Sequence, residues 1–220
     1  MNKPIVIAID AMGGDNSPNK IIDGIELYSQ KNNNIFYKLF GDKDQIEKSL
    51  KNKKININSY EIVHTDNIVK GEDTALAAAK RGKTTSMWMS IESVKKKNSD
   101  IALSAGNTGA LFVIAKLNLE MIDKIDKPAL SGLWPNKTGM NIVLDLGANI
   151  ECNEKNLLDF SIMGAALHKS LFPKDNPKVA LLNIGSEELK GNTVIKNTYQ
   201  NLSKVDSSLF EFKGYVEGNN

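Results

Sequence analysis

Short apolar runs recur along the chain, separated by longer segments in which apolar residues have helical spacing. This alternation is typical of a parallel sheet covered by helices, because a crossover helix usually joins consecutive parallel strands. The expected strands are residues 5–10, 35–40, 60–64, 101–104, 129–133, 142–145 and 179–183. The expected helices are residues 18–30, 43–50, 85–97, 107–121, 156–171 and 187–202, with Ser17 capping the first. The pattern predicts one open α/β domain over residues 1–220.

Composition agrees with a folded domain and removes some classes of function. The 220 residues are 41% hydrophobic, which is enough for a real core and argues against disorder. A formal net charge of +2 produces no strong electrostatic field around the protein, so nucleic-acid binding is not expected. The run Lys95–Lys97 is best interpreted as the solvated end of a helix, with a membrane-surface or acidic-partner role as the alternative.

The single cysteine, Cys152, excludes an internal disulfide and a multi-cysteine metal cluster, and it fits a reducing, cytosolic setting. A packing cysteine is the preferred interpretation, ahead of a nucleophile that forms an acyl-thioester. The apolar run at residues 5–9 is far too short for a signal peptide and suits a buried first strand. We expect no membrane-spanning segment.

Residues 104–110, Ser-Ala-Gly-Asn-Thr-Gly-Ala, join an expected strand to an expected helix through a glycine turn. Gly106 and Gly109 let the backbone bend and approach a ligand closely. The free amides at the start of a helix carry partial positive charge and can hold an anion. This turn therefore suits a phosphate-like group, although a tight packing turn without a ligand is the alternative.

Three further loops follow expected strands at their carboxyl ends, where ligands bind in open α/β sheets. They are residues 8–15, 144–149 and 182–192. In the first, Gly13 and Gly14 would let the chain approach a ligand. Asp15 would orient a basic partner, or would merely lie at the start of the helix near Ser17. Residues 124–141, rich in Pro and Gly, mark either a seam or an active-site loop.

Cations and one histidine supply the remaining candidates in the first half of the chain. Arg81 and Lys83 precede the hydroxyls of residues 84–86, an arrangement that can hold an anion, and a solvated helix end is the alternative. His64 ends an expected strand, where it would act as an acid toward a leaving group or serve only as a satisfied loop histidine.

Taken together and in order, these loops resemble the bacterial phosphate acyltransferase (PlsX) family. The resemblance rests on Ala-Met-Gly-Gly-Asp at 11–15, Ser-Ala-Gly-Asn-Thr-Gly-Ala at 104–110, Asp-Leu-Gly-Ala-Asn at 145–149, Asn-Ile-Gly-Ser-Glu-Glu at 183–188 with Lys-Gly-Asn at 190–192, and Gly-Tyr-Val-Glu-Gly-Asn at 214–219. It extends from Ile5 to the last residue. Thr74 and Ala75 depart from the Lys-Pro pair that the family pattern leads us to expect.

The resemblance implies an enzyme that converts acyl-[acyl-carrier-protein] and inorganic phosphate into acyl phosphate for phospholipid synthesis. It implies a Rossmann-like three-layer α/β/α sandwich of the isocitrate/isopropylmalate dehydrogenase type. It also implies a cytoplasmic homodimer with possible peripheral membrane association and no metal or nucleotide cofactor. The chain stops inside the last motif, so we expect it to be the N-terminal portion of a longer fold.

The chemistry of such a reaction needs no covalent nucleophile. Phosphate is already a good anionic nucleophile, and a phosphopantetheine thiolate, with a pKa near that of a free thiol, leaves readily. The protein must hold phosphate beside the thioester and stabilise the tetrahedral oxyanion with fixed donors, each contributing roughly 3 to 4 kcal/mol. The expected catalytic residues are Asn107, Thr108, Asp15 and His64. The expected phosphate- or substrate-binding residues are Gly13, Gly14, Arg81, Lys83, Gly106, Gly109, Asp145, Asn149, Asn183, Glu187 and Lys190.

Two other functions stay open from the sequence. One is an NAD-dependent dehydrogenase of related fold, although its metal-binding Asp cluster and dinucleotide motif are not evident. The other is a noncatalytic remnant that binds phosphate or carrier protein without turnover.

Overall fold

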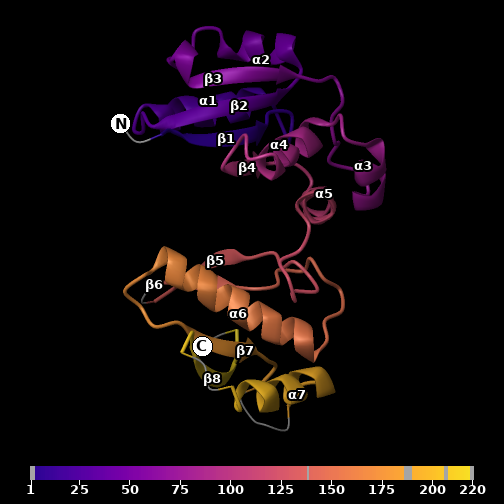
Figure 1. Ribbon diagram of the computed structural model, residues 1–220, viewed down its shortest axis with the longest axis vertical. Coiled ribbons are helices and arrows are strands. Elements are labelled where there is room, and N and C mark those ends of the chain that lie inside the picture. Colours follow the sequence, from indigo (N-terminus) through magenta and orange to yellow (C-terminus); the bar gives the residue numbers. More distant parts are fainter. Residues whose placement is uncertain (1–2, 138, 186–189, 206–207, 219–220) are drawn as a thin grey trace. The chain divides into compact units, whose positions relative to one another are not determined.

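The computed structural model describes residues 3–137, 139–185, 190–205 and 208–218 (Figure 1). The chain divides into two compact units, residues 1–120 and 121–220, which are treated separately below. The expectation of a single domain over the whole chain stays a prediction.

The first unit is built on a four-stranded parallel sheet. Its strands are β1 (Ile5–Asp10), β2 (Ile35–Gly41), β3 (Tyr60–His64) and β4 (Ile101–Ser104). They are ordered β3-β2-β1-β4, so β1 lies between β2 and β4. The helices are α1 (Asn19–Ser29), α2 (Lys43–Leu50), α3 (Ala75–Arg81), α4 (Ser86–Lys95) and α5 (Thr108–Leu119), with a short 3-10 helix at Ile57–Ser59.

Alternating side chains of the strands divide the core of this unit into two clusters. Ile9 of β1 and Leu39 of β2, which are partners in the parallel register, pack with Ile22 of α1 and Ile46 of α2. A second cluster joins helices α3, α4 and α5 around Met87, with Ala102 of β4 packed against it. Ala102 is in register with Ala8, one residue out of phase with Ile9, so it belongs to the other face of the sheet.

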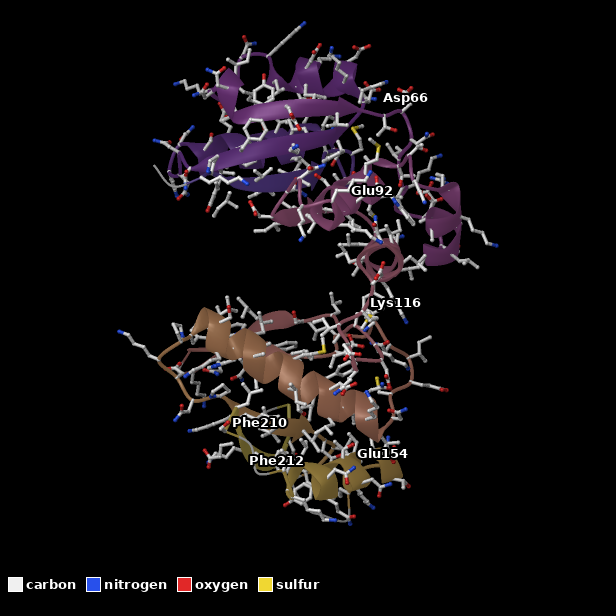
Figure 2. All side chains as sticks on the ribbon, viewed as in Figure 1. Asp66, Glu92, Lys116, Glu154, Phe210 and Phe212 are labelled. Carbon is white, nitrogen blue, oxygen red and sulfur yellow. The ribbon has the colours of Figure 1, made fainter. Side chains whose placement is uncertain are left out.

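The described residues of the second unit form two small sheets and two helices. Strands β5 (Gly132–Asn136) and β6 (Gly139–Val143) form an antiparallel hairpin, whereas β7 (Lys178–Leu182) and β8 (Glu211–Val216) are parallel. Helices α6 (Glu154–Leu171) and α7 (Thr193–Leu202) complete the unit. Ala165, Leu181, Leu202 and Phe210 form its core, with Phe212 packed against them (Figure 2).

The expected strands at 5–10, 60–64 and 101–104 match the structure residue for residue, and those at 35–40 and 179–183 agree within one residue at either end. Other expectations were wrong. Strands expected at 129–133 and 142–145 lie at 132–136 and 139–143, helix α3 and strand β8 were missed, and the described strands form three sheets rather than one. Ser17 does not cap α1, because Pro18 holds the cap position and makes no side-chain cap.

The helix expected at 187–202 is found only from Thr193 onward. Residues 186–189 lie outside the described part of the chain. Within the described part, no helix combines the length and apolar character needed to cross a bilayer.

Candidate functional site

The carboxyl ends of β1 and β4 lie side by side, with Asp10 in register with Ser104. The chain leaves β1 toward β2 on one side, whereas β4 pairs with β1 on the other side. This reversal of strand order is the switch point at which open parallel sheets bind ligands, because the two outgoing loops leave a crevice between them. The two loops that meet here are the glycine loops identified in the sequence, at 11–15 and 104–110.

Asp10 lies beneath these two loops and is hydrogen-bonded to both. The residue is only 2% exposed, and its Oδ1 accepts hydrogen bonds from Ser86 Oγ at 2.6 Å and from the Met12 amide at 3.4 Å. Its Oδ2 accepts from Ser104 Oγ at 2.7 Å, and that hydroxyl in turn accepts from the Gly106 amide at 3.1 Å. Burial raises the pKa of the Asp10 carboxyl, and the hydrogen bonds from Ser86 and Ser104 oppose that rise.

Gly13 and Gly14 allow the first loop to lie directly on the second. A Cβ at position 13 would lie 2.6 Å from Asp10 Oδ2, 2.7 Å from Ser104 Oγ and 2.9 Å from the Gly106 amide nitrogen. Gly14 has a φ of +88°, and a Cβ there would lie 2.5 Å from the Ala105 carbonyl oxygen. Both positions therefore require glycine, one for space and one for both space and conformation. We call residues 13–14 and 104–109 the glycine cradle.

The open end of helix α5 forms the exposed side of the glycine cradle. Thr108 and Gly109 are exposed and occupy the first two positions of the helix, where backbone amides have no partner within the helix. These amides, the Thr108 hydroxyl and the helix dipole can hold an anion. Here the structure brings together five predicted residues: Gly13, Gly14, Gly106, Thr108 and Gly109.

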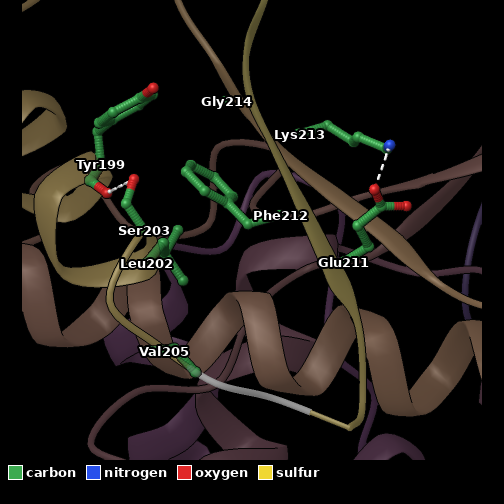
Figure 3. A pocket seen from close by; sticks show the side chains of 8 residues that line it. All are labelled: Tyr199, Leu202, Ser203, Val205, Glu211, Phe212, Lys213 and Gly214. Carbon is green, nitrogen blue, oxygen red and sulfur yellow. Dashed lines mark hydrogen bonds and ion pairs between the residues drawn. The ribbon is translucent and has the colours of Figure 1, made fainter.

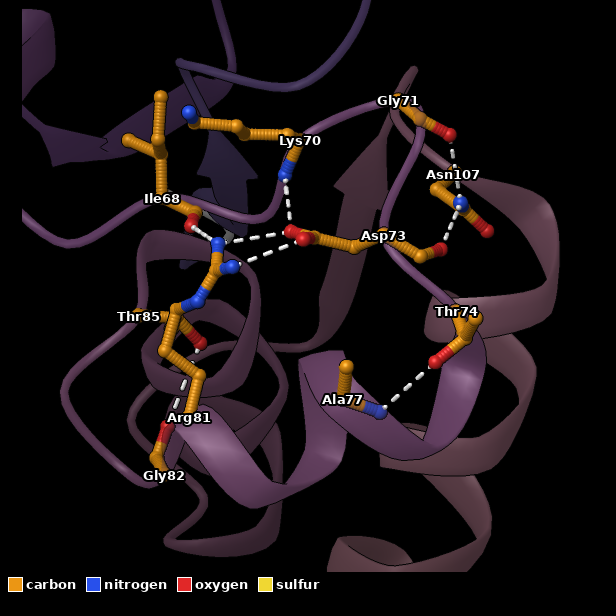
Figure 4. Close-up of polar contacts among 10 residues, drawn as sticks. All are labelled: Ile68, Lys70, Gly71, Asp73, Thr74, Ala77, Arg81, Gly82, Thr85 and Asn107. Carbon is orange, nitrogen blue, oxygen red and sulfur yellow. Dashed lines mark hydrogen bonds and ion pairs between the residues drawn. The ribbon is translucent and has the colours of Figure 1, made fainter.

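Asn107 lies in the glycine cradle, but its side chain bonds to the protein. Its Oδ1 caps α5 by accepting from the Ala110 amide at 2.9 Å. Its Nδ2 donates to the carbonyl oxygens of Gly71 at 2.8 Å and Asp73 at 2.9 Å (Figure 4). Both amide hydrogens thus hold the loop of residues 68–74 in place, so the expected donation from this side chain to a ligand stays a prediction.

Arg81, predicted to bind phosphate, is engaged by the same loop. Its two terminal nitrogens each lie 2.7 Å from a different oxygen of Asp73, and Nη1 also donates to the Ile68 carbonyl at 2.7 Å (Figure 4). The Lys70 amide and the Arg81 guanidinium hold the pKa of the Asp73 carboxyl below its usual value. In this arrangement Arg81 fastens loop 68–74 beside Asn107, and its expected role in binding phosphate stays a prediction.

Three other predicted residues of the first unit lie outside the hydrogen-bonded network of the glycine cradle. Asp15 and Lys83 are both exposed. His64 ends β3, where its Nδ1 accepts from the Lys43 amide at 3.2 Å and its Nε2 lies 3.6 Å from Asp66 Oδ2. Strand β2 lies between β3 and β1, and within the described part of the chain no hydrogen bond joins His64 to the cradle.

The predicted residues of the second unit form two separate groups. Asp145 accepts from the amides of Leu130 at 2.8 Å and Asn149 at 2.7 Å, and it also accepts from Asn149 Nδ2 at 2.8 Å. Asn183 Nδ2 donates to the carbonyls of Gly185 at 3.0 Å and Lys190 at 3.2 Å. These side chains organise their own loops. Glu187, another predicted binding residue, lies outside the described residues.

The second unit also has a surface hollow of about 540 Å³ between α7 and β8 (Figure 3). It is lined by Tyr199, Leu202, Ser203, Val205, Glu211, Phe212, Lys213 and Gly214. Lys213 pairs with Glu211 at its rim, and none of the predicted site residues lines it. Elsewhere in this unit, burial raises the pKa of the Cys152 thiol, which disfavours the thiolate and suits a packing role.

Sequence reasoning missed Asp10, Ser86 and Ser104 as individual members of the site. Asp10 carried one usable signal, because an acidic residue closes a strand of otherwise apolar residues. Ser86 gave none, since it lies 76 positions from Asp10 and only the packing of α4 against the sheet brings the two together. Among the described residues, no group of three His, Cys, Asp or Glu side chains is placed to hold a metal ion.

Comparison with known proteins gives one family and several relatives. Residues 5–220 match the family model described as fatty acid synthesis protein. The chain is 64% identical over 219 residues to the phosphate acyltransferase of Pelagibacter ubique, covering 100% of this chain and 65% of that protein. It is 41% identical over 219 residues to the phosphate acyltransferase of Bradyrhizobium diazoefficiens, covering 99% and 62%. The chain thus spans a little under two thirds of the length of these relatives.

Two solved structures share the fold at low sequence identity. A branched-chain phosphotransacylase from Enterococcus faecalis matches with a TM-score of 0.56 and 15% identity, over 97% of this chain and 67% of that one. The EutD phosphotransacetylase from Staphylococcus aureus matches with a TM-score of 0.67 and 12% identity, over 97% and 69%. A mostly parallel α/β arrangement is therefore common to all three chains.

Proposed function

Because this chain belongs to the family of fatty acid synthesis proteins, we propose that it acts as a phosphate acyltransferase. It converts acyl-[acyl-carrier-protein] and inorganic phosphate into acyl phosphate and free carrier thiol, for phospholipid synthesis. The names of its relatives support this reaction. The observation that carries the proposal is the glycine cradle, in which the exposed start of α5 meets the loop after β1 at the switch point of the sheet.

In the proposed reaction, a phosphate oxygen attacks the thioester carbonyl carbon. The new C–O bond gives a tetrahedral oxyanion, and its collapse breaks the C–S bond and releases the thiolate, which then takes a proton from solvent or an acid. Phosphate is held by the amides of Thr108 and Gly109 and by the Thr108 hydroxyl, at the positive end of the α5 dipole. Holding the two reactants together supplies most of the acceleration, because neither needs chemical activation.

The remaining candidates take supporting roles in this proposal. Asn107 acts through its hold on loop 68–74, Asp15 orients a cationic group, and His64 supplies a proton to the leaving sulfur. Lys83 is an exposed cation that can neutralise phosphate, whereas Arg81 reaches a ligand only if it leaves Asp73. Within the second unit, the proposed substrate-binding residues are Asp145, Asn149, Asn183, Glu187 and Lys190.

We also propose the setting in which the enzyme works. The fold is a Rossmann-like three-layer α/β/α sandwich of the isocitrate/isopropylmalate dehydrogenase type, and the likeness to phosphotransacylase structures supports it. The enzyme is a cytoplasmic homodimer that uses acyl carrier protein as its protein partner, associates peripherally with the membrane, and needs no cofactor.

The decisive experiment follows thiol release from acyl-carrier thioester by the purified chain, with phosphate, with sulfate and with neither. Sulfate has the shape and charge of a ligand for the glycine cradle but is a poor nucleophile. We expect thiol release with phosphate alone, formation of an acyl phosphate that hydroxylamine traps, and inhibition of the phosphate reaction by sulfate. Equal thiol release without phosphate would refute the reaction. A folded chain that binds phosphate and releases no thiol would leave only a binding role.

A further inference from the structure

Asp10 is a buried titratable residue that the proposed reaction does not use. Its carboxylate lies beneath the glycine cradle and is reached by three segments of the chain, two of which are distant from it in sequence. These are the loop after β1 through the Met12 amide, the first turn of α4 through Ser86, and the end of β4 through Ser104. Removing a carboxylate from water is costly, so its place at this junction calls for a specific role.

The bonds of Asp10 continue into the backbone that would contact a ligand. Ser104 Oγ donates to Asp10 and accepts from the Gly106 amide, which lies two residues before Thr108. Gly13 packs against the same three groups, since a Cβ on it would come within 2.9 Å of Asp10, Ser104 and Gly106. Any displacement of the carboxylate therefore moves both loops of the glycine cradle.

We propose that Asp10 is a positioning residue, whose carboxylate fixes the two loops of the glycine cradle through Ser104 and Ser86 so that the α5 amides are held ready for an anion. Asp10 itself does not touch the ligand. The carboxylate suits this task because each of its oxygens accepts a hydroxyl hydrogen, which leaves the Ser104 oxygen oriented toward the Gly106 amide. The inference rests on the proposed function, because it assumes that the anion held by the glycine cradle is phosphate.

Two substitutions test the role and a third serves as control. Asp10→Asn keeps the size of the side chain but offers one acceptor oxygen in place of two, so either the Ser104 side or the side of Ser86 and Met12 loses its bond. Ser104→Ala cuts the link from Asp10 to Gly106. The control is Ser99→Ala, which removes another buried hydroxyl of the first unit, bonded to Ser93 at 2.8 Å.

The first readout is phosphate affinity measured by isothermal titration calorimetry. We expect Asp10→Asn and Ser104→Ala to weaken phosphate binding about tenfold, the loss that corresponds to one charge-assisted hydrogen bond, and Ser99→Ala to leave it within about twofold. Loss of affinity in all three variants would mean general loosening of the unit and would overturn the inference. Unchanged affinity in a folded Asp10→Asn would do the same.

The second readout is amide hydrogen exchange at Gly106 without any ligand, which separates this inference from the proposed function. Ser104→Ala should speed exchange at Gly106 more than tenfold while amides in β2 keep their protection, because it removes the hydroxyl that joins the Gly106 amide to Asp10. If the unmodified chain binds no phosphate, the proposed site is wrong, whatever the exchange shows. If exchange at Gly106 does not change, the positioning role is wrong, even in an active enzyme.

Discussion

Replacing Gly13 by alanine tests the contact between the two loops of the glycine cradle. The added Cβ would lie 2.6 to 2.9 Å from three atoms, which is 0.5 to 0.8 Å inside the 3.4 Å at which ordinary contact begins. None of the three is the free end of a flexible chain, because the oxygens of Asp10 and Ser104 are hydrogen-bonded and the third atom is the backbone nitrogen of Gly106. Overpacking of this kind costs about 1 to 3 kcal/mol, and we expect a value near the upper end.

The same unit offers a control substitution, Gly24→Ala, whose expected effect on stability has the opposite sign. Gly24 lies exposed within α1, and nothing lies within 4 Å of a Cβ built on it. Alanine there should stabilise the helix by about 0.5 to 1 kcal/mol, because glycine loses more conformational entropy on folding. The two alanine substitutions therefore add the same methyl group to the same unit with opposite expected effects.

Urea unfolding followed by tryptophan fluorescence measures both effects. The chain has two tryptophans, Trp88 in α4 of the first unit and Trp134 in β5 of the second, so a Trp134→Phe background makes Trp88 the reporter of the first unit. With a slope of about 1 to 3 kcal/mol per molar urea, Gly13→Ala should lower the midpoint by about 1 M and Gly24→Ala should raise it slightly. A midpoint for Gly13→Ala equal to or above that of the parent would refute the steric argument.

Three further predictions concern the loops around the site. Asn107→Asp should keep the α5 cap but lose the bonds to loop 68–74 and weaken phosphate binding about tenfold by calorimetry, because it adds negative charge beside the anion; equal affinity would contradict this. The Lys70 amide and Arg81 lower the pKa of Asp73, so these contacts stabilise the fold above the unfolded pKa near 3.8, and this stabilisation is lost as pH falls through the folded pKa. The gap in urea midpoint between the parent and Asp73→Asn should therefore close between neutral and strongly acidic pH, and a constant gap would argue against it. Asp145→Ala should speed amide exchange at Leu130 while β7 stays protected, and unchanged exchange would show that the bond does not hold the loop.

The sheet of the first unit was predictable because its strands have clear limits in the sequence. β1 and β4 are mostly apolar runs that end at a polar residue followed by a glycine turn, so both could be bounded to the residue. For the hairpin of the second unit, the predicted start of each strand was wrong by three residues. The reason is Pro135 within β5, because a proline indicates a turn unless the strand lies at an edge. Strand β8 was missed because Lys213 and Gly214 interrupt its apolar residues.

The glycine cradle was predictable as a pair of loops, but the roles of its side chains were not. Gly13 and Gly106 are needed where two backbones approach closely, and that requirement is local and visible in the sequence. What Asn107 and Arg81 bind depends on loop 68–74. Backbone carbonyls and the Asp73 carboxylate of this loop accept the hydrogen bonds that the two side chains donate. A sequence shows which residues can donate to an anion, but not whether another part of the chain has already bonded to them.

The bond between Ser104 and Asp10 also sets an order of events during synthesis. The two residues are 94 positions apart, so a growing chain carries β1 and its glycine loop long before the partner strand leaves the ribosome. Until then the Asp10 carboxylate lacks the hydrogen bond from Ser104. For most of that time it also lacks the hydrogen bond from Ser86. The cradle is therefore assembled late, after its slow long-range pairing, and a phosphate ion bound as proposed would stabilise the completed unit but not the fragments that precede it.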